Sequence, residues 1–330
     1  MPSPTPGASL APAAPAGAGT RVARSARSAN FAGIVWMVVA MAAFAIEDAL
    51  VKHAARELPI GELLVIFGLG GALVFAALAW REGVPLFTAA VCSPSMAVRA
   101  LFELVGRLFY VLAIALAPLS SATAILQATP VLVVLGASLY FGEQVGWRRW
   151  AAVAAGLVGV VIVLRPTADD FSALSVLALV GMAGFAGRDL ASRAVPATLG
   201  TVHLGFYGFL TVVLAGVLYA AWQGQAFVWP GPAAALVLGA AIVVGALAYG
   251  CLMKAMRTGD IASVTPFRYT RLVFGIGLGV VVFDERVDAP MLLGCAVIVI
   301  AGMLIVWDGR RRAQPAAGSA RPGHEGSPAR

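Results

Sequence analysis

Charged side chains are scarce in this sequence. Aspartate, glutamate, lysine and arginine make up 12% of its 330 residues, whereas 60% are hydrophobic, and the formal net charge is +7. A soluble domain typically has about 25% charged and about 45–50% apolar residues. The deficit excludes an ordinary soluble protein. It predicts an all-α integral membrane protein, because the apolar runs are continuous and the backbone of a spanning segment must be satisfied internally.

Cysteine is also rare, and its copies are far apart. Cys92, Cys251 and Cys295 form no CxxC or Cys/His pattern, so neither a disulfide framework nor a zinc site is predicted. Walker, HExxH and GxSxG motifs are missing too, which removes support for ATP-driven transport and for hydrolysis. We therefore predict no catalytic residue, no metal, no cofactor and no nucleic-acid partner.

Ten apolar runs separated by polar, proline or glycine breaks are long enough to cross a membrane as helices. They lie at about 33–52, 60–80, 97–117, 120–141, 148–165, 172–192, 200–222, 233–254, 260–283 and 288–307. The first run is too long for the apolar core of a signal peptide, which predicts an uncleaved anchor helix. Residues 1–30 and 308–330 are rich in Pro, Ala, Gly and Ser, and both tails are predicted to be disordered.

Loop charges predict the orientation of these helices. With the N-terminus inside, twelve arginines and lysines fall in cytoplasmic segments and four in external ones. Basic loops stay on the cytoplasmic side of a membrane. Both termini are therefore predicted to be cytoplasmic.

The sequence contains an internal repeat. Two corresponding runs end in Tyr140-Phe141-Gly142-Glu143 and in Val282-Phe283-Asp284-Glu285. The repeat predicts two five-helix halves, 31–166 and 171–307, which must be inverted in the membrane because five is odd. Glu143 and Glu285 are predicted to end their helices and to contact the N-terminus of the next helix or a nearby backbone N–H. Inverted repeats are typical of transporters, which bind substrate between the repeats near the midplane.

With this pattern, residues 31–307 resemble the EamA branch of the drug/metabolite transporter superfamily. The resemblance implies alternating access in a bacterial inner membrane, with a central cavity lined by helices 1, 3, 4, 6, 8 and 9. Residues 266–272 resemble members associated with uptake of S-adenosylmethionine or riboflavin, while other members export amino acids and related metabolites. Asp284 departs from the glycine that is usual before the second glutamate.

Two arginines fall in the interior of the ninth run. Arg268 and Arg271 lie eight and eleven positions past Asp260, about 12–16 Å into a hydrocarbon core about 30 Å thick. A guanidinium at that depth costs at least about 2.5–3.5 kcal/mol unless it meets protein, water or a partner charge. Either arginine is a candidate for binding an anionic or zwitterionic substrate, with Tyr269 supplying a ring or a hydroxyl. The sequence leaves open which arginine does so.

Prolines mark both repeats at matching places. Pro266 precedes the arginines, and Pro130 follows Gln127 in the fourth run. Proline cannot donate a backbone hydrogen bond, and interrupted helices in both halves point to a transporter site. We predict Pro130 and Pro266 as hinges and Gln127 as a substrate contact. A packing kink is the alternative.

Other ionisable residues lie on the first, third and sixth runs. Glu103 and Arg107 are predicted substrate contacts, together with Tyr249 of the eighth run. The alternative is that Arg99–Glu103–Arg107 and Asp189–Arg193 are ion pairs within their helices.

The first run ends with two acids that are candidates for coupling a proton or an ion. Glu47 and Asp48 are predicted for this role because an acid in a dry site has a raised pKa. The alternative is that Asp48 pairs with Lys52, one turn away.

These features predict a secondary transporter of a small polar organic metabolite, acting as a monomer or homodimer in membrane lipid. Uptake and export both stay open. A non-transporting scaffold or a membrane-embedded enzyme is the alternative. An enzyme would need a nucleophile and base, or metal ligands, clustered at one depth, and the sequence contains no such cluster.

Overall fold

The fold was analysed in a computed structural model that describes residues 18–141, 146–164, 174–258 and 264–313. The described chain is helical throughout, with no strand in these ranges. The first half comprises α1 (Ala18–Ala54), α2 (Ile60–Glu82), η1 (Ala89–Cys92), α3 (Pro94–Leu116), α4 (Leu119–Leu126), α5 (Thr129–Phe141) and α6 (Trp147–Leu164). The second comprises α7 (Ser175–Ser192), α8 (Thr201–Gln223), α9 (Pro232–Thr258), η2 (Thr265–Tyr269), α11 (Thr270–Phe283) and α12 (Ala289–Ala313).

Seven segments of this fold are long and apolar enough to cross a membrane. They are Ala29–Ala54, Ile60–Glu82, Leu119–Tyr140, Thr201–Gln223, Pro232–Met256, Thr265–Phe283 and Ala289–Trp307. Helices α3, α6 and α7 also coincide with predicted spans but are not among the seven. Two of them, α3 and α7, carry buried or half-buried charges, and the apolar part of α6 is short, Trp150–Leu164. The count of ten spans therefore stays a prediction.

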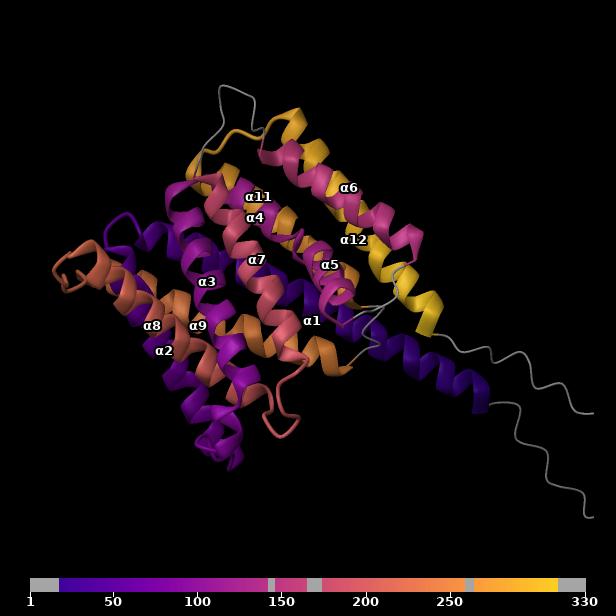
Figure 1. The fold of residues 1–330 in the computed structure, drawn as a ribbon, viewed down its shortest axis with the longest axis horizontal. Helices are drawn as coiled ribbons and strands as arrows, with labels where there is room; N and C mark the ends of the chain where they lie inside the picture. Colours follow the sequence, from indigo (N-terminus) through magenta and orange to yellow (C-terminus); the bar gives the residue numbers. More distant parts are fainter. Residues whose placement is uncertain (1–17, 142–145, 165–173, 259–263, 314–330) are drawn as a thin grey trace, which may run out of the picture.

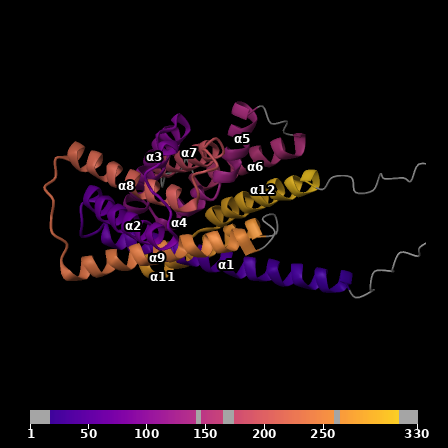
Figure 2. The ribbon, with the colours of Figure 1, turned by 90° about the horizontal axis from the view of Figure 1, so that it is seen from below.

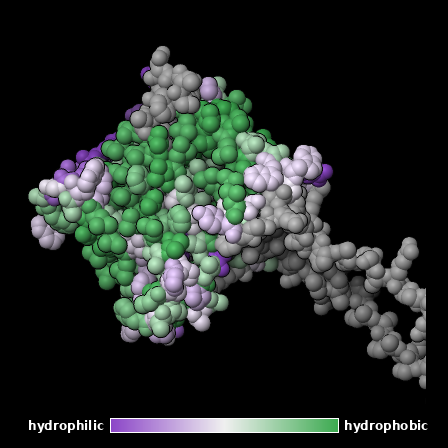
Figure 3. Space-filling view, in the orientation of Figure 1, coloured by the Kyte–Doolittle hydropathy of each residue, from purple (hydrophilic) through white to green (hydrophobic). Residues whose placement is uncertain are grey.

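Much of the surface of the molecule is apolar, as expected for a protein in contact with lipid. Figure 3 shows a broad face covered mainly by hydrophobic residues, with hydrophilic ones gathered towards its edges. Large apolar side chains such as Leu73, Leu236, Val273 and Val281 are well exposed on this helical bundle. A soluble monomer rarely exposes contiguous apolar surface on this scale. The observation agrees with a multi-pass membrane protein.

Helices pack mainly across the two halves of the chain. Helix α1 packs on α9, α3 on α7, α2 on α8, α6 on α12 and α4 on α11 (Figures 1 and 2). Close approach needs glycine at some of these crossings. A Cβ on Gly184 of α7 would lie 2.4 Å from the backbone nitrogen of Gly106 on α3. Small residues at helix contacts are how membrane helices gain packing energy.

The tails are shorter than the sequence predicts. Helix α1 begins at Ala18 and α12 continues to Ala313, so residues 18–30 and 308–313 are helical. The physical reason is composition, because no proline follows Pro15 before the first span and alanine and arginine favour helix. The remaining tail residues, 1–17 and 314–330, lie outside the described chain. The start of α1 and the end of α12 lie at the same end of the molecule in both views (Figures 1 and 2).

Both predicted hinge prolines lie at helix interruptions. Helix α4 ends at Leu126 and α5 begins at Thr129, so Pro130 lies in the first turn of α5, where a missing N–H is tolerated. The Leu126 carbonyl instead accepts a hydrogen bond from the Thr129 hydroxyl at 2.5 Å. Pro266 lies in the 3₁₀ segment η2, and the Thr270 hydroxyl donates to the Phe267 carbonyl at 2.7 Å. The two interruptions are thus built alike.

Candidate functional site

Asp48 is the centre of a buried cluster that joins α1, α3 and α11. Its Oδ2 accepts hydrogen bonds from the Tyr110 hydroxyl at 2.9 Å and from the Arg271 guanidinium at 2.5 Å. The Arg271 guanidinium also lies 5.2 Å from the centre of the Phe44 ring. Asp48 is 2% exposed, so removing either charge would leave the other unpaired away from water. The positive charge of Arg271 is therefore already balanced within the protein.

Glu47 takes part in a second ion pair beside the first. Its Oε1 lies 3.3 Å from Arg107 of α3, and the Arg107 guanidinium lies 5.5 Å from the centre of the Phe67 ring. The two acids predicted to couple a proton or an ion, Glu47 and Asp48, are thus both buried against arginines. Arg107 does not continue a chain of pairs along α3, because its carboxylate partner is on α1.

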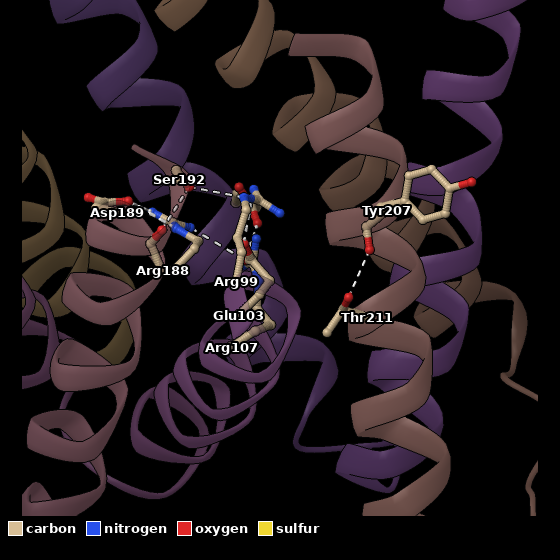
Figure 4. A network of polar contacts seen from close by, with 9 residues as sticks. Arg99, Glu103, Arg107, Arg188, Asp189, Ser192, Tyr207 and Thr211 are labelled. Atoms are coloured by element: carbon tan, nitrogen blue, oxygen red, sulfur yellow. Dashed lines mark hydrogen bonds and ion pairs between the residues drawn. The ribbon is translucent and has the colours of Figure 1, made fainter. Parts of the chain in front are cut away.

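A third network links α3 to α7 (Figure 4). Glu103 lies 3.5 Å from Arg99 on its own helix and 3.4 Å from Arg188 on α7. Arg188 also binds Asp189 at 2.8 Å. Of the predicted pairs within helices, the Arg99–Glu103 contact is present, and Arg188 neutralises Asp189. The figure shows these side chains converging between the two helices.

Lys52 does not pair with Asp48, which corrects one alternative drawn from the sequence. Its ammonium donates to the carbonyls of Ile114 and Ala117 at 2.9 and 2.6 Å, and it lies 3.6 Å from Glu285. These carbonyls end α3, and an ammonium group is well suited to satisfy free carbonyls at a helix C-terminus. We call Lys52, Glu285 and the ends of α3 and α4 the helix-end cluster.

Glu285 completes the helix-end cluster. Its carboxylate accepts hydrogen bonds from the backbone N–H groups of Leu119 and Ser120 at 2.6 and 2.9 Å, and from the Ser120 hydroxyl at 2.6 Å. The helix is α4 of the first half, so the predicted contact with the next helix along the chain was wrong, and the backbone N–H groups that bind Glu285 belong to the other half of the chain. A carboxylate at a helix N-terminus satisfies free donors and interacts favourably with the helix dipole. Glu143 lies outside the described residues.

The two helix interruptions meet at Gln127 and Arg268. The side-chain amide of Gln127 donates to the backbone carbonyl of Arg268 at 2.9 Å. The Arg268 side chain is exposed and has no hydrogen bond or ion pair with any residue of the described ranges. The charges that act on it are those of Asp189, Arg188 and Arg271, so it lies near the interior polar groups. The structure thus brings Gln127 and Arg268, two predicted substrate contacts, close together.

Two predicted tyrosines lie elsewhere. Tyr269 is 7% exposed and its hydroxyl lies where a Cβ on Gly302 of α12 would be, with no hydrogen-bond partner in the described chain. Tyr249 packs its ring edge-on against Phe75 with 5.0 Å between ring centres. Its hydroxyl lies 3.5 Å from the Thr201 carbonyl. Neither ring is placed beside the Arg268 guanidinium by any contact of the described residues.

Sequence reasoning missed two contributors to these clusters. Tyr110 lies three positions after Arg107, and this spacing places both side chains on one face of the helix, which could have indicated Tyr110 as a member of the cluster. Arg188 is the second, because it links Glu103 to Asp189. Both omissions concern contacts between helices, which spacing along one helix does not predict.

The fold and these buried charge clusters define a multi-pass helical membrane protein. A model of the EamA-like transporter family matches residues 31–165 and again residues 173–307. The chain belongs to the EamA-like transporter family. This confirms the resemblance seen in the sequence.

Several curated proteins are similar along most of the chain. A riboflavin transporter of Vibrio cholerae serotype O1 is 28% identical over 295 residues, 84% of this chain and 94% of that protein. The pseudopaline exporter CntI of Pseudomonas aeruginosa is 29% identical over 273 residues, 82% and 94% of the two chains. An S-adenosylmethionine uptake transporter of Rickettsia bellii is 23% identical over 285 residues, 84% and 94%. A protein of known crystal structure shares the fold, with a TM-score of 0.55 and 20% identity over 87% of this chain and 99% of that one.

Proposed function

We propose that this protein is a secondary transporter that moves a small polar organic metabolite across a bacterial inner membrane by alternating access. Membership of the EamA-like family and the names of its relatives support transport of a small metabolite. In this proposal ten helices form two inverted repeats, 31–166 and 171–307, and both termini are cytoplasmic.

One observation carries the proposal. The interruption between α4 and α5 and the 3₁₀ segment η2 come from different halves of the chain, yet they are joined by the hydrogen bond from Gln127 to the Arg268 carbonyl. Discontinuous helices that meet between two repeats are where transporters hold their substrates, because non-helical backbone offers polar groups at membrane depth. The substrate site is therefore assigned to this meeting point, with Pro130 and Pro266 as its hinges.

The pattern of helix contacts supports the inverted arrangement. Exchanging the first half for the second turns the α1–α9 contact into the α3–α7 contact. The same exchange leaves the α2–α8 and α6–α12 contacts unchanged. A two-fold relation between the halves requires such a pattern. Rocking one half against the other about that axis would expose the meeting point to each side in turn.

Transport direction is tested separately from transport itself. The relatives comprise a riboflavin transporter, an S-adenosylmethionine uptake transporter and a pseudopaline exporter, so both directions have support. We expect flux in proteoliposomes loaded on either side to identify the substrate and the preferred direction. The panel contains riboflavin, S-adenosylmethionine and free amino acids.

The site assignment is tested by Gln127→Leu. This change removes the hydrogen bond to the Arg268 carbonyl, and we expect it to slow flux strongly while leaving the melting temperature near that of the wild type. Gln223→Leu is the matched control, because Gln223 bonds Tyr219 at the end of α8, away from the interruptions. Equal flux in wild type and Gln127→Leu would contradict the site assignment. Wild-type protein that moves no compound in either direction would contradict the proposed function.

A further inference from the structure

In the ion pairs of the described residues, each positive side chain is matched by one negative side chain. Each of five basic side chains lies within 4.0 Å of a different carboxylate. The pairs are Lys52–Glu285, Arg99–Glu103, Arg107–Glu47, Arg188–Asp189 and Arg271–Asp48. These pairs sum to zero, so they leave no charge to attract a ligand.

Arg268 is a membrane-segment cation that takes part in none of these pairs. It belongs to the same membrane-crossing segment as Arg271, three positions earlier, and no carboxylate of the described residues pairs with it. Its neighbour Arg188 is occupied by Glu103 and Asp189. A guanidinium at membrane depth requires water, protein or a counter-charge around it, and a bound anion would supply the counter-charge.

The backbone beside Arg268 is held on two sides. Gln127 donates to its carbonyl, and the next residue, Tyr269, is fixed against Gly302 of α12. The backbone at Arg268 is therefore fixed in place, while the N–H donors of its guanidinium stay accessible. A planar guanidinium offers paired N–H donors that match a carboxylate or a phosphate.

We propose that Arg268 is the residue that determines substrate specificity, by binding one anionic group, a carboxylate or a phosphate, of the transported metabolite. Arg271 does not contact substrate and instead balances Asp48. This assignment rests on the proposed transport function. It predicts that a metabolite with one negative charge at its binding end is preferred over its uncharged analogue.

The first test compares matched ligands. Purified full-length protein is assayed for thermal stabilisation and, in proteoliposomes, for flux with two pairs of compounds. These are riboflavin and its 5′-phosphate, and N-acetylated neutral amino acids and their amides, so that the two members of each pair differ by one anionic group. We expect the charged member of at least one pair to stabilise and to be transported in preference to the uncharged one. The phosphate and carboxylate pairs distinguish the two kinds of anion.

The second test changes the arginine. Arg268→Gln should raise the KM for the charged compound by roughly tenfold to hundredfold, as expected for loss of hydrogen bonds to a charged group. It should leave the KM of the uncharged analogue unchanged. Arg268→Lys keeps the positive charge but loses the paired N–H donors of the guanidinium. Its KM for the charged compound should lie between those of the wild type and Arg268→Gln. Arg56→Gln removes an exposed positive charge at the end of α1 and should behave as wild type.

The outcomes separate the two proposals. Flux of uncharged compounds only, or an Arg268→Gln variant that keeps the preference for the charged compound, would overturn the role of Arg268 and leave transport standing. Thermal stabilisation by an anion that depends on Arg268, without flux of any compound, would support the binding role and overturn transport. No stabilisation and no flux with either pair would overturn both.

Discussion

Helices α4 and α11 pack along one another, and the two ends of this pair differ in how they treat polar groups. At one end, the Glu285 carboxylate accepts three hydrogen bonds from the start of α4 and faces Lys52. At the other end, Gln127 holds the backbone of Arg268 but the guanidinium has no partner in the described chain. The first end is complete without a ligand. At the second end the Arg268 guanidinium stays unpaired among the described residues, which is why we propose that end, and not the first, for binding substrate.

The largest effect is expected where a complete cluster loses one charge. Asp48→Asn should lower the free energy of unfolding by about 3–5 kcal/mol, because Arg271 would be left buried and uncompensated. Loss of monodisperse protein on size-exclusion chromatography, or a large fall in melting temperature, checks this. The double variant Asp48→Asn/Arg271→Gln is the control and should recover part of the loss. A single variant as stable as wild type would show that the cluster does not hold α1, α3 and α11 together.

A smaller loss is expected at the helix-end cluster. Glu285→Gln keeps the shape of the side chain but removes its charge, and we expect a loss of about 1–2 kcal/mol from the capping of α4. Melting in detergent measures it. Glu57→Gln, at an exposed position beyond the end of α1, is the matched control and should be neutral. A Glu285→Gln melting temperature equal to that of Glu57→Gln would refute the capping role.

Tyr269 should be insensitive to loss of its hydroxyl. The group is buried without a partner in the described chain, so Tyr269→Phe should be neutral or stabilising by up to about 1 kcal/mol. Flux should be unchanged, since the ring packs on α12. A marked loss of flux at normal stability would restore Tyr269 as a substrate contact.

The smallest effect on stability is expected at the end of the α4–α11 pair that carries Arg268. Arg268→Gln should change the free energy of unfolding by no more than about 0.5 kcal/mol, because the side chain is exposed and makes no pair in the described ranges. Arg271→Gln, three residues later, should be strongly destabilising. Melting the two variants side by side measures the contrast directly. Similar melting temperatures for both would remove the distinction between the two ends.

Much of the fold was predictable from the sequence, because helices in a membrane must be long apolar runs. All ten predicted runs coincide with helices or pairs of helices, and Pro130 and Pro266 marked the interruptions. The rotation of the side chains was not predictable. A straight α-helix would place Arg268 and Arg271 on one face, but η2 is a 3₁₀ segment with about three residues per turn. Its geometry points Tyr269 towards α12. The two arginines then lie in different surroundings, Arg271 against Asp48 and Arg268 exposed.

Partner choice between helices was likewise beyond the sequence. Lys52 lies one turn after Asp48 and looks like its natural partner, yet the carbonyls at the end of α3 and the Glu285 carboxylate bind it instead. Such choices depend on which helix ends lie side by side. A single sequence gives no direct measure of that, and the sequence accordingly left Arg268 and Arg271 undistinguished.

In the proposed transporter, the contact between Tyr269 and Gly302 would let position 302 on α12 influence substrate selectivity from outside the site. Any side chain there would occupy the place of the Tyr269 hydroxyl and push the segment that carries Arg268. Natural divergence or laboratory evolution can therefore retune substrate choice from α12 without altering a residue of the site. A library at 302, screened against a graded series of metabolites, would sample new selectivities while the charge pairs keep the scaffold intact.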